Sequence, residues 1–140
     1  MTPRQIELVR SSFAIVEPIA DTAAALFYAR LFELDPALRD LFASDLTAQR
    51  RNLMQTLTVV VRGLDRLDTI VPAVEALGRR HTGYGVRPED FETVGAALLD
   101  TLEGALGPSF TPETRNAWAA AYGLLASVMI GAQAEAASAA

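Results

Sequence analysis

Apolar residues recur at helical spacing along most of this chain, and no stretch alternates polar and apolar residues as a half-buried strand would. One stripe consists of Ile70, Val74, Leu77 and His81, whose offsets of four, three and four place them on one face of a helix. The composition is globular, with 51% hydrophobic and 21% charged residues. The sequence therefore predicts an all-α fold, and a length of 140 residues predicts one domain over residues 1–140.

Proline, glycine and capping residues divide the predicted helices. Thr2-Pro3 and Thr111-Pro112 are typical helix starts, and Gly107-Pro108 is a typical stop. The predicted helices cover residues 3–16, a segment with apolar residues at 24–32, a short piece at 36–42, then 46–62, a helix carrying 70–81, then 91–105 and a last helix from 112. Residues 83–88 form a predicted corner, and residues 135–140 are expected to fray.

Charge and composition exclude several classes of function. A net charge of −5 disfavours binding to nucleic acid or to an anionic membrane surface, and all twelve basic residues are arginines spread along the chain. Without cysteine there is no disulfide and no thiolate metal site. The N-terminal residues lack the pattern of a signal peptide, so a cytoplasmic protein is expected. Residues 116–134 are uncharged, but their many small residues favour a buried helix over a membrane span.

Three polar side chains fall on otherwise apolar helix faces: Tyr28, Gln49 and His81, the only histidine. Burying such a group without a partner costs about 1–3 kcal/mol, so each needs a hydrogen bond or a ligand. In one interpretation Tyr28 and Gln49 bond to each other or to backbone, and His81 to a carbonyl one turn back. In the other, they surround a ligand. The residues alone favour the first, since most buried polar groups are satisfied within the protein.

Other chemistry is poorly supported by the sequence. There is no nucleophile–histidine–acid triad, no cluster of several metal ligands, and no phosphate-binding glycine loop after a strand.

Longer stretches resemble a known family. The order of the helices, Phe42, the helix with Gln49 and Leu53, and the segments 77–81 and 106–118 resemble globins across nearly the whole chain. The similarity is to single-domain bacterial haemoglobins, to the haem domains of flavohaemoglobins and to neuroglobins. It implies a globin fold of about seven to eight helices around a haem b group.

The resemblance also implies roles for individual residues. His81 would be the axial ligand of the haem iron, and Tyr28 and Gln49 would donate hydrogen bonds to oxygen on the opposite side. Bound oxygen draws negative charge from ferrous iron, so two donors would slow its release. Contacts with the porphyrin would come from Phe42, Leu53, Leu77 and Val86.

The sequence departs from the flavohaemoglobin pattern near the axial histidine. A tyrosine and a glutamate that polarise this histidine in the family correspond to Phe91 and Gln133 here. His81 is therefore expected to donate to a backbone carbonyl, that of Leu77. For the haem propionates, Arg80 is the first candidate partner and Arg51 the second, although either could be a solvated surface residue. Gln49 stands where neuroglobins have a second histidine ligand.

Three functions are compatible with these residues. The first is reversible, high-affinity oxygen binding for storage or transport, with NO and CO as further gas ligands. The second is a nitric oxide dioxygenase that depends on a separate reductase. The third is a sensor or a haemless interaction module, which gives no reason for His81, Tyr28 and Gln49 to share inward faces.

Overall fold

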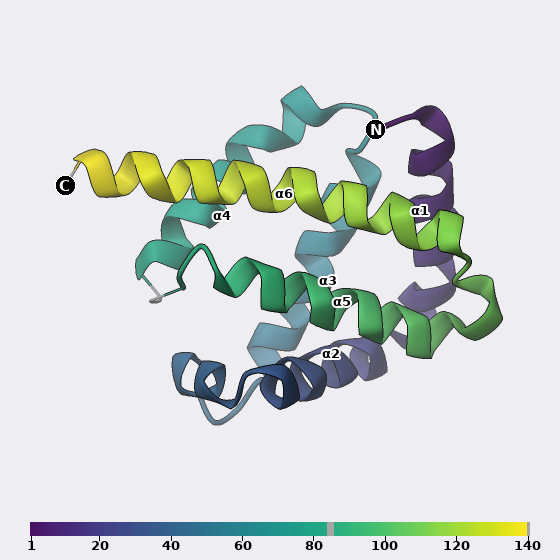
Figure 1. Cartoon of the computed structure of the whole chain (residues 1–140), viewed down its shortest axis with the longest axis horizontal. Coiled ribbons are helices and arrows are strands. Elements are labelled where there is room, and N and C mark those ends of the chain that lie inside the picture. The colour runs from purple at the N-terminus through teal and green to yellow at the C-terminus, as the bar shows by residue number, and fades with distance from the viewer. Residues whose placement is uncertain (84–85, 140) are drawn as a thin grey trace.

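The computed structural model describes residues 1–83 and 86–139 and is helical throughout its regular elements. The elements are α1 (Pro3–Val16), η1 (Glu17–Ile19), α2 (Ala20–Leu34), η2 (Pro36–Leu41), α3 (Thr47–Arg62), α4 (Leu67–Gly83), α5 (Asp90–Leu106), η3 (Gly107–Ser109) and α6 (Pro112–Ala139) (Figure 1). The predicted all-α class is confirmed. The described part of the chain has six α-helices and three short 3₁₀ helices, where about seven to eight helices were expected. The number of α-helices is lower because short connecting pieces such as Pro36–Leu41 form 3₁₀ helices.

The predicted helix starts and stops are confirmed where local chemistry sets them. The hydroxyl of Thr2 accepts from the N–H of Gln5, whose side chain accepts from the N–H of Thr2, a complete capping box. The hydroxyl of Thr111 accepts from the N–H of Thr114 at 3.2 Å and caps α6 in the same way. Gly107, with a φ of 54°, ends α5 in a left-handed conformation that favours glycine.

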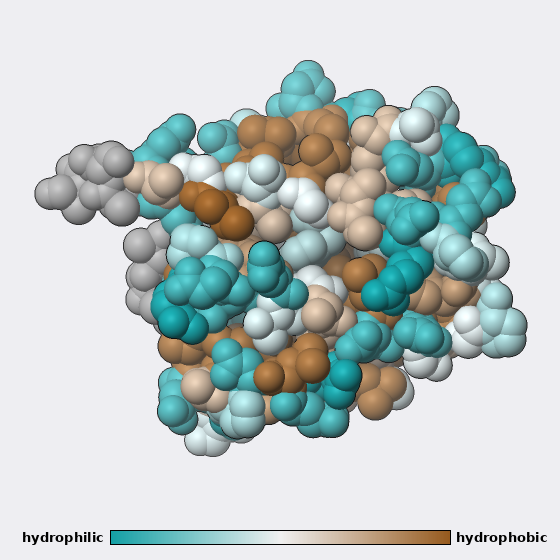
Figure 2. Space-filling model, viewed as in Figure 1, coloured by the Kyte–Doolittle hydropathy of each residue, from teal (hydrophilic) through white to brown (hydrophobic). Residues whose placement is uncertain are grey.

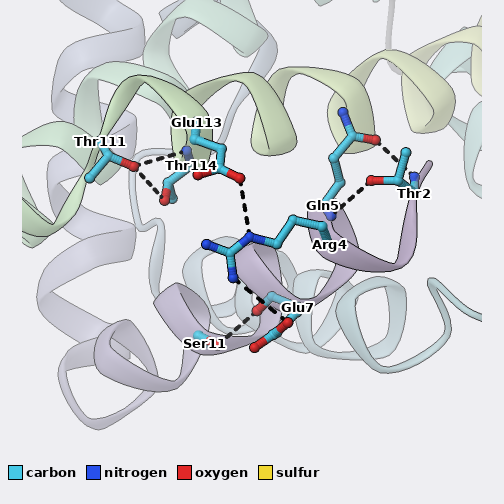
Figure 3. A network of polar contacts seen from close by, with 8 residues as sticks. All are labelled: Thr2, Arg4, Gln5, Glu7, Ser11, Thr111, Glu113 and Thr114. Atoms are coloured by element: carbon cyan, nitrogen blue, oxygen red, sulfur yellow. Dashed lines mark hydrogen bonds and ion pairs between the residues drawn. The ribbon is translucent and has the colours of Figure 1, made fainter.

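The N-terminal ends of α1 and α6 lie together. Nε of Arg4 donates to Glu113 across the two helices at 3.1 Å, within the network drawn in Figure 3. Deeper in this contact, the indole N–H of Trp118 donates to the hydroxyl of Ser12 at 2.8 Å, and both residues are buried. The buried hydrogen bond satisfies the indole and gives α1 and α6 a fixed register.

Helix α4 crosses the C-terminal half of α6 at a glycine (Figure 1). A Cβ atom added to Gly78 would lie 2.6 Å from the carbonyl oxygen of Met129 and 2.7 Å from its Cα atom. The backbones therefore approach more closely than any side chain would allow. Because His81 follows Gly78 by less than one turn, this crossing also fixes where the histidine lies.

The remaining helices complete the enclosure of the core. Helix α2 packs on α5 and α3 packs on α2, while α4 is held by α6. Aromatic and aliphatic side chains from these helices are buried together, among them Phe13, Phe27, Leu31, Leu98 and Trp118. A cavity remains where α2, η2, α3, α4 and α5 meet.

The surface carries scattered apolar residues. On the face in Figure 2, hydrophobic side chains form small groups separated by hydrophilic ones. Two helical stretches, Pro3–Leu34 and Pro112–Glu135, are long and apolar enough to cross a membrane by length and composition alone, a test that core helices also pass. Both stretches supply core side chains such as Phe13 and Trp118.

The C-terminal tail is partly outside the described residues. The backbone of α6 is helical through Ala139, and residue 140 is not described. The expected fraying of residues 135–140 stays a prediction.

The α4–α6 crossing predicts opposite effects for two glycine substitutions. Gly78→Ala should destabilise the fold by about 1–3 kcal/mol, because the new methyl group meets backbone that cannot move aside. Gly104→Ala, in the last turn of α5 with open space around it, should stabilise by about 0.5–1 kcal/mol. Urea unfolding followed by circular dichroism measures both, and equal stability of the two variants would contradict the close crossing.

Candidate functional site

The cavity between the helices has a volume of about 350 Å³, within the usual range of ligand sites. Its walls are mostly aromatic and aliphatic, with His81 on the side of α4 and Tyr28 on the side of α2. Among the described residues that line it, Asp90 is the only charged one. The lining residues are Phe27, Tyr28, Leu31, Leu38, Leu41, Phe42, Ala43, Gln49, His81, Val86, Asp90, Phe91 and Val94.

His81 is half-buried and is oriented by its own helix. Its Nδ1 lies 2.7 Å from the carbonyl oxygen of Leu77, one turn back, as predicted. A carbonyl can only accept, so Nδ1 carries the hydrogen and the lone pair of the neutral ring is on Nε2. The ring of Phe91 lies 6.3 Å away, tilted by 38°. The imidazole is thus held in the tautomer in which Nε2 can ligate a metal.

The lowered pKa of His81 also favours its role as a metal ligand. Burial lowers its pKa, and the positive charge of Arg80 lowers it further, while the hydrogen bond to Leu77 acts in the opposite direction. The neutral imidazole, which is the form that binds metals, is therefore favoured at neutral pH.

Tyr28 lies at the centre of an aromatic cluster on the other side of the cavity. Its ring contacts Phe27 edge-on at 5.0 Å and Phe42 edge-on at 5.6 Å, and Phe32 stands 5.6 Å from Phe42. Only 4% of Tyr28 is exposed. Burial raises the pKa of its phenol, so that the hydroxyl keeps its proton and stays a hydrogen-bond donor at neutral pH.

Gln49 joins Tyr28 at the edge of the cavity. A hydrogen bond with the side chain of Gln49 partly opposes the rise in the pKa of Tyr28. The two side chains therefore lie close to each other at the cavity. Gln49 was expected on an inward face, and it lines the cavity, although the residue as a whole is exposed. It lies in the first turn of α3.

The other predicted contact residues divide into two groups. Phe42 and Val86 line the cavity. Leu53 packs against the core but is not among the residues that line the cavity. Leu77 and Arg80 line a second cavity of about 200 Å³ between α3 and α4. The structure thus brings Tyr28, Gln49, Phe42, Val86 and His81 together and leaves Leu53, Leu77 and Arg80 beside them.

The predicted arginine partners of a haem carboxylate lie away from the cavity. Arg80 is exposed at the second cavity, and Arg51 is exposed in a groove between α2 and α3. Arg80 was chosen because it adjoins His81 in the sequence, and consecutive residues of a helix do not face the same way. Their pairing with propionates stays a prediction.

Asp90 is a site residue that the sequence did not indicate. It is 3% exposed, and its carboxylate accepts from the N–H of Arg87 at 2.9 Å and from the guanidinium of Arg87 at 3.1 Å. This hydrogen bond to Asp90 raises the pKa of Arg87. The charge of the buried Asp90 carboxylate is therefore compensated by Arg87, three residues earlier. An acidic residue in the first turn of a helix is common, so this spacing did not indicate a site in the sequence.

Arg39 is a second residue missed by sequence reasoning. Its guanidinium donates to three successive carbonyls, those of Phe42 at 3.2 Å, Ala43 at 2.9 Å and Ser44 at 3.0 Å, and lies 5.4 Å from the ring centre of Phe32. Phe42 and Ala43 line the cavity. Arg39 thus fixes the connection between η2 and α3. Its targets are main-chain atoms, which leave no residue pattern to read.

The polar groups of the site fit haem better than a bare metal ion. No group of three or more histidine, cysteine, aspartate or glutamate side chains is found in the described part of the chain. Porphyrin supplies four nitrogen ligands itself, so one fixed imidazole in an apolar cavity is the donor set that haem requires. The predicted corner residues Tyr84 and Gly85 lie outside the described residues.

Comparison with known proteins identifies the family. The globin family model matches residues 25–129, three quarters of the chain, so the chain belongs to the globin family. It is 30% identical over 131 residues to a flavohemoprotein of Bacillus subtilis and 34% identical over 134 residues to one of Deinococcus radiodurans. These matches include 91% and 94% of this chain but only 33% of each relative, so the chain spans about a third of their length.

Solved structures show the same fold. A bacterial globin of Campylobacter jejuni superimposes with a TM-score of 0.85 at 23% identity, over 96% of this chain and 97% of that one. An engineered carbene transferase derived from RmaNOD, which is named as a candidate nitric oxide dioxygenase of Rhodothermus marinus, superimposes with a TM-score of 0.90 at 25% identity. That match covers 99% of this chain and 97% of the other. The predicted globin fold is therefore confirmed.

The Arg39 contacts predict a change in local opening. Arg39→Lys keeps the charge but cannot bond three carbonyls with a planar fork, so amides of residues 42–46 should exchange with deuterium about tenfold faster or more. Hydrogen exchange read by mass spectrometry measures this. Arg4→Ala, which removes an exposed ion pair, is the control and should leave this segment unchanged. Wild-type exchange in Arg39→Lys would show that charge alone holds the segment.

Proposed function

We propose that this globin binds haem b through His81 and binds oxygen reversibly on the side of Tyr28 and Gln49. The observation that supports this most is a cavity that presents on one side an imidazole whose Nδ1–H donates to the carbonyl of Leu77, and on the other side a buried phenol that keeps its proton. Haem iron, when held, would supply the coordination position for a diatomic gas. Residues 1–140 would act as one globin domain.

His81 would hold the haem as a neutral imidazole ligand. A carbonyl is a weaker acceptor partner than a carboxylate, so the Leu77 bond orients the ring without giving it strong anionic character. This arrangement favours reversible ligand binding over chemistry that needs a strongly electron-donating ligand. Phe42 and Val86 would contact the porphyrin from two sides.

Tyr28 and Gln49 would set the preference among gases. Both can donate hydrogen bonds, and the surrounding aromatic cluster keeps the phenol in an apolar setting where such bonds are stronger. Oxygen draws more negative charge than CO, so it should gain more from these donors. Nitric oxide would be a third gas ligand.

A second candidate function is nitric oxide dioxygenation with a separate reductase. It is favoured by the flavohemoprotein relatives and by the structural neighbour derived from RmaNOD. Two thirds of the length of those relatives has no counterpart in these 140 residues. In this candidate function, a separate reductase would supply the electrons for repeated turnover.

Ultraviolet–visible spectra test the haem site. The wild-type protein should bind one haem per chain, with distinct ferric, ferrous, oxygen and CO forms. His81→Gly should lose stable haem retention, and free imidazole should restore it by filling the position of the lost ring. Tightly held haem in His81→Gly without imidazole would contradict the assignment of His81.

Stopped-flow oxygen release tests the two donors. Tyr28→Phe and Gln49→Ala should each raise the release rate by about three- to tenfold and together by about one to two decades, since each donor contributes about 0.5–1.5 kcal/mol. The release of CO should change less and serves as the control. Unchanged oxygen release in the double variant would exclude this donor pair.

Sustained consumption of NO separates the two functions. With NADH and an added flavin reductase, a dioxygenase consumes NO over many turnovers, whereas an oxygen-binding protein without reductase coupling stops after one. The measurement is made on the wild-type protein with an NO electrode.

A further inference from the structure

A group of aromatic rings connects Tyr28 to the segment that follows η2. The centre of the Tyr28 ring lies 5.0 Å from that of Phe27 and 6.1 Å from that of Phe32, and all three residues belong to α2. Phe42, which comes from outside α2, lies 5.6 Å from both Tyr28 and Phe32. Edge-on packing favours definite ring orientations, and the hydroxyl of Tyr28 moves with its ring. A displaced Phe42 would therefore also displace this hydroxyl.

Arg39 binds both polar groups of the Phe42 backbone. The carbonyl of Arg39 accepts from the N–H of Phe42 at 3.2 Å, and the guanidinium of Arg39 donates to the carbonyl of Phe42 at 3.2 Å. The same guanidinium donates to the carbonyls of Ala43 and Ser44, at 2.9 and 3.0 Å. The Phe42 ring therefore projects from a backbone that a single residue holds in place.

The guanidinium of Arg39 also lies over the ring of Phe32. Its Cζ atom is 5.4 Å from the centre of that ring, a distance at which a cation is attracted to an aromatic face. One arginine thus contacts the backbone of Phe42 and the ring of Phe32. These are two of the three rings that pack around Tyr28.

Arg10 makes a comparable contact at the other end of α3. Its Nε donates to the carbonyl of Val61 at 3.1 Å, and its Nη2 donates to the carbonyl of Arg62 at 2.8 Å. Arg10, Val61 and Arg62 are not among the described residues that line the cavity. Binding of carbonyls by an arginine is therefore not in itself a feature of the site, and Arg10 provides a matched control for Arg39.

We propose that Arg39 is a positioning residue for the oxygen donor Tyr28, whose ring it holds in place through Phe42 and Phe32. The inference rests on the proposed binding of oxygen on the side of Tyr28. Arg39 is not among the described residues that line the cavity, so it acts through the rings and not on the gas itself. Part of the selectivity among gases is thereby assigned to a residue outside the cavity wall.

A double-mutant cycle tests this role. It compares the wild-type protein, Arg39→Lys, Tyr28→Phe and the variant with both changes. Lysine keeps the charge but lacks the planar fork that binds three carbonyls while lying on a ring. Arg10→Lys is the control, because it makes the same replacement at the other end of α3.

Two kinds of measurement are made on each protein. Stopped-flow spectroscopy gives the rates of oxygen and CO release from the haem-bound form. Nuclear magnetic resonance of the apo-protein gives the ring signals of the tyrosines, and the signals of Tyr28 are those that Tyr28→Phe lacks. These signals report on the packing of Phe27, Phe32 and Phe42 around the Tyr28 ring without any haem.

A positioning role predicts a specific combination of results. Arg39→Lys should shift the Tyr28 ring signals and release oxygen about two- to fivefold faster, since a displaced hydroxyl loses part of its hydrogen bond. In the Tyr28→Phe background the same replacement should leave oxygen release unchanged, because the donor that Arg39 positions is absent. The release of CO should change less. Arg10→Lys should keep wild-type release rates and wild-type Tyr28 signals.

Other outcomes overturn the inference. Wild-type Tyr28 signals or wild-type oxygen release in Arg39→Lys would refute the positioning role. Equal acceleration with and without the Tyr28 hydroxyl, for both gases, would show that the variant only opens an exit path. If Arg39→Lys does not fold, Phe32→Leu takes its place in the cycle with the same expectations, because it removes the ring that the guanidinium contacts.

Failure of the proposed function gives a different result. A wild-type protein that takes up no haem would refute that function, and the inference with it, before any variant is made. Wild-type oxygen release in Tyr28→Phe would refute the donor role of Tyr28, on which the inference rests. Only a failure confined to Arg39→Lys or its replacement counts against Arg39 alone.

Discussion

The close contact between α4 and α6 is the constraint on which the rest of the site depends. Gly78 lies against the backbone of Met129, and no side chain separates the two helices there. His81 follows three residues after Gly78. A change in the crossing would therefore also move the imidazole. The glycine thus determines how the helix that carries the candidate ligand lies on α6.

The cavity combines neutral donors with an apolar wall. Tyr28 keeps its proton because it is buried, and His81 is favoured as the neutral ring for the same reason. Among the described residues, Asp90 is the one charged residue that lines the cavity, and its carboxylate forms an ion pair with Arg87. This ion pair reduces the effect of the Asp90 charge on the electric field in the cavity. Dipoles rather than net charges therefore determine how the cavity responds to a polar ligand. Such fixed dipoles stabilise small charge shifts without attracting ions.

Local chemistry made much of the fold predictable from sequence. The capping box at Thr2, the cap at Thr111 and the stop at Gly107 act within a few residues, so the helix ends that they set were predicted correctly. The His81–Leu77 hydrogen bond was predictable for the same reason, because it spans one turn of one helix. These features do not depend on how the helices pack.

The rest of the site depends on contacts between distant segments. Periodicity placed Leu77 on an inward face but could not tell which cavity that face borders. The structure places Leu77 beside the second cavity, together with Arg80, which was chosen only because it adjoins His81. Gln49 lines the cavity, but periodicity could not tell that the residue as a whole is exposed. Arg39 bonds to carbonyls, which every residue has. Its role could not be predicted from side-chain patterns.

The Arg39 contact has a consequence for protein engineering. Since the guanidinium recognises only main-chain oxygens of Phe42, Ala43 and Ser44, the path of this segment does not require particular side chains at 43 and 44. Ala43 lines the cavity, and both residues are exposed. Side chains of different size could be introduced at position 43 to narrow or chemically tag the cavity without rebuilding the loop. The cavity lining at this position can thereby be varied independently of the Arg39 contacts that support the segment.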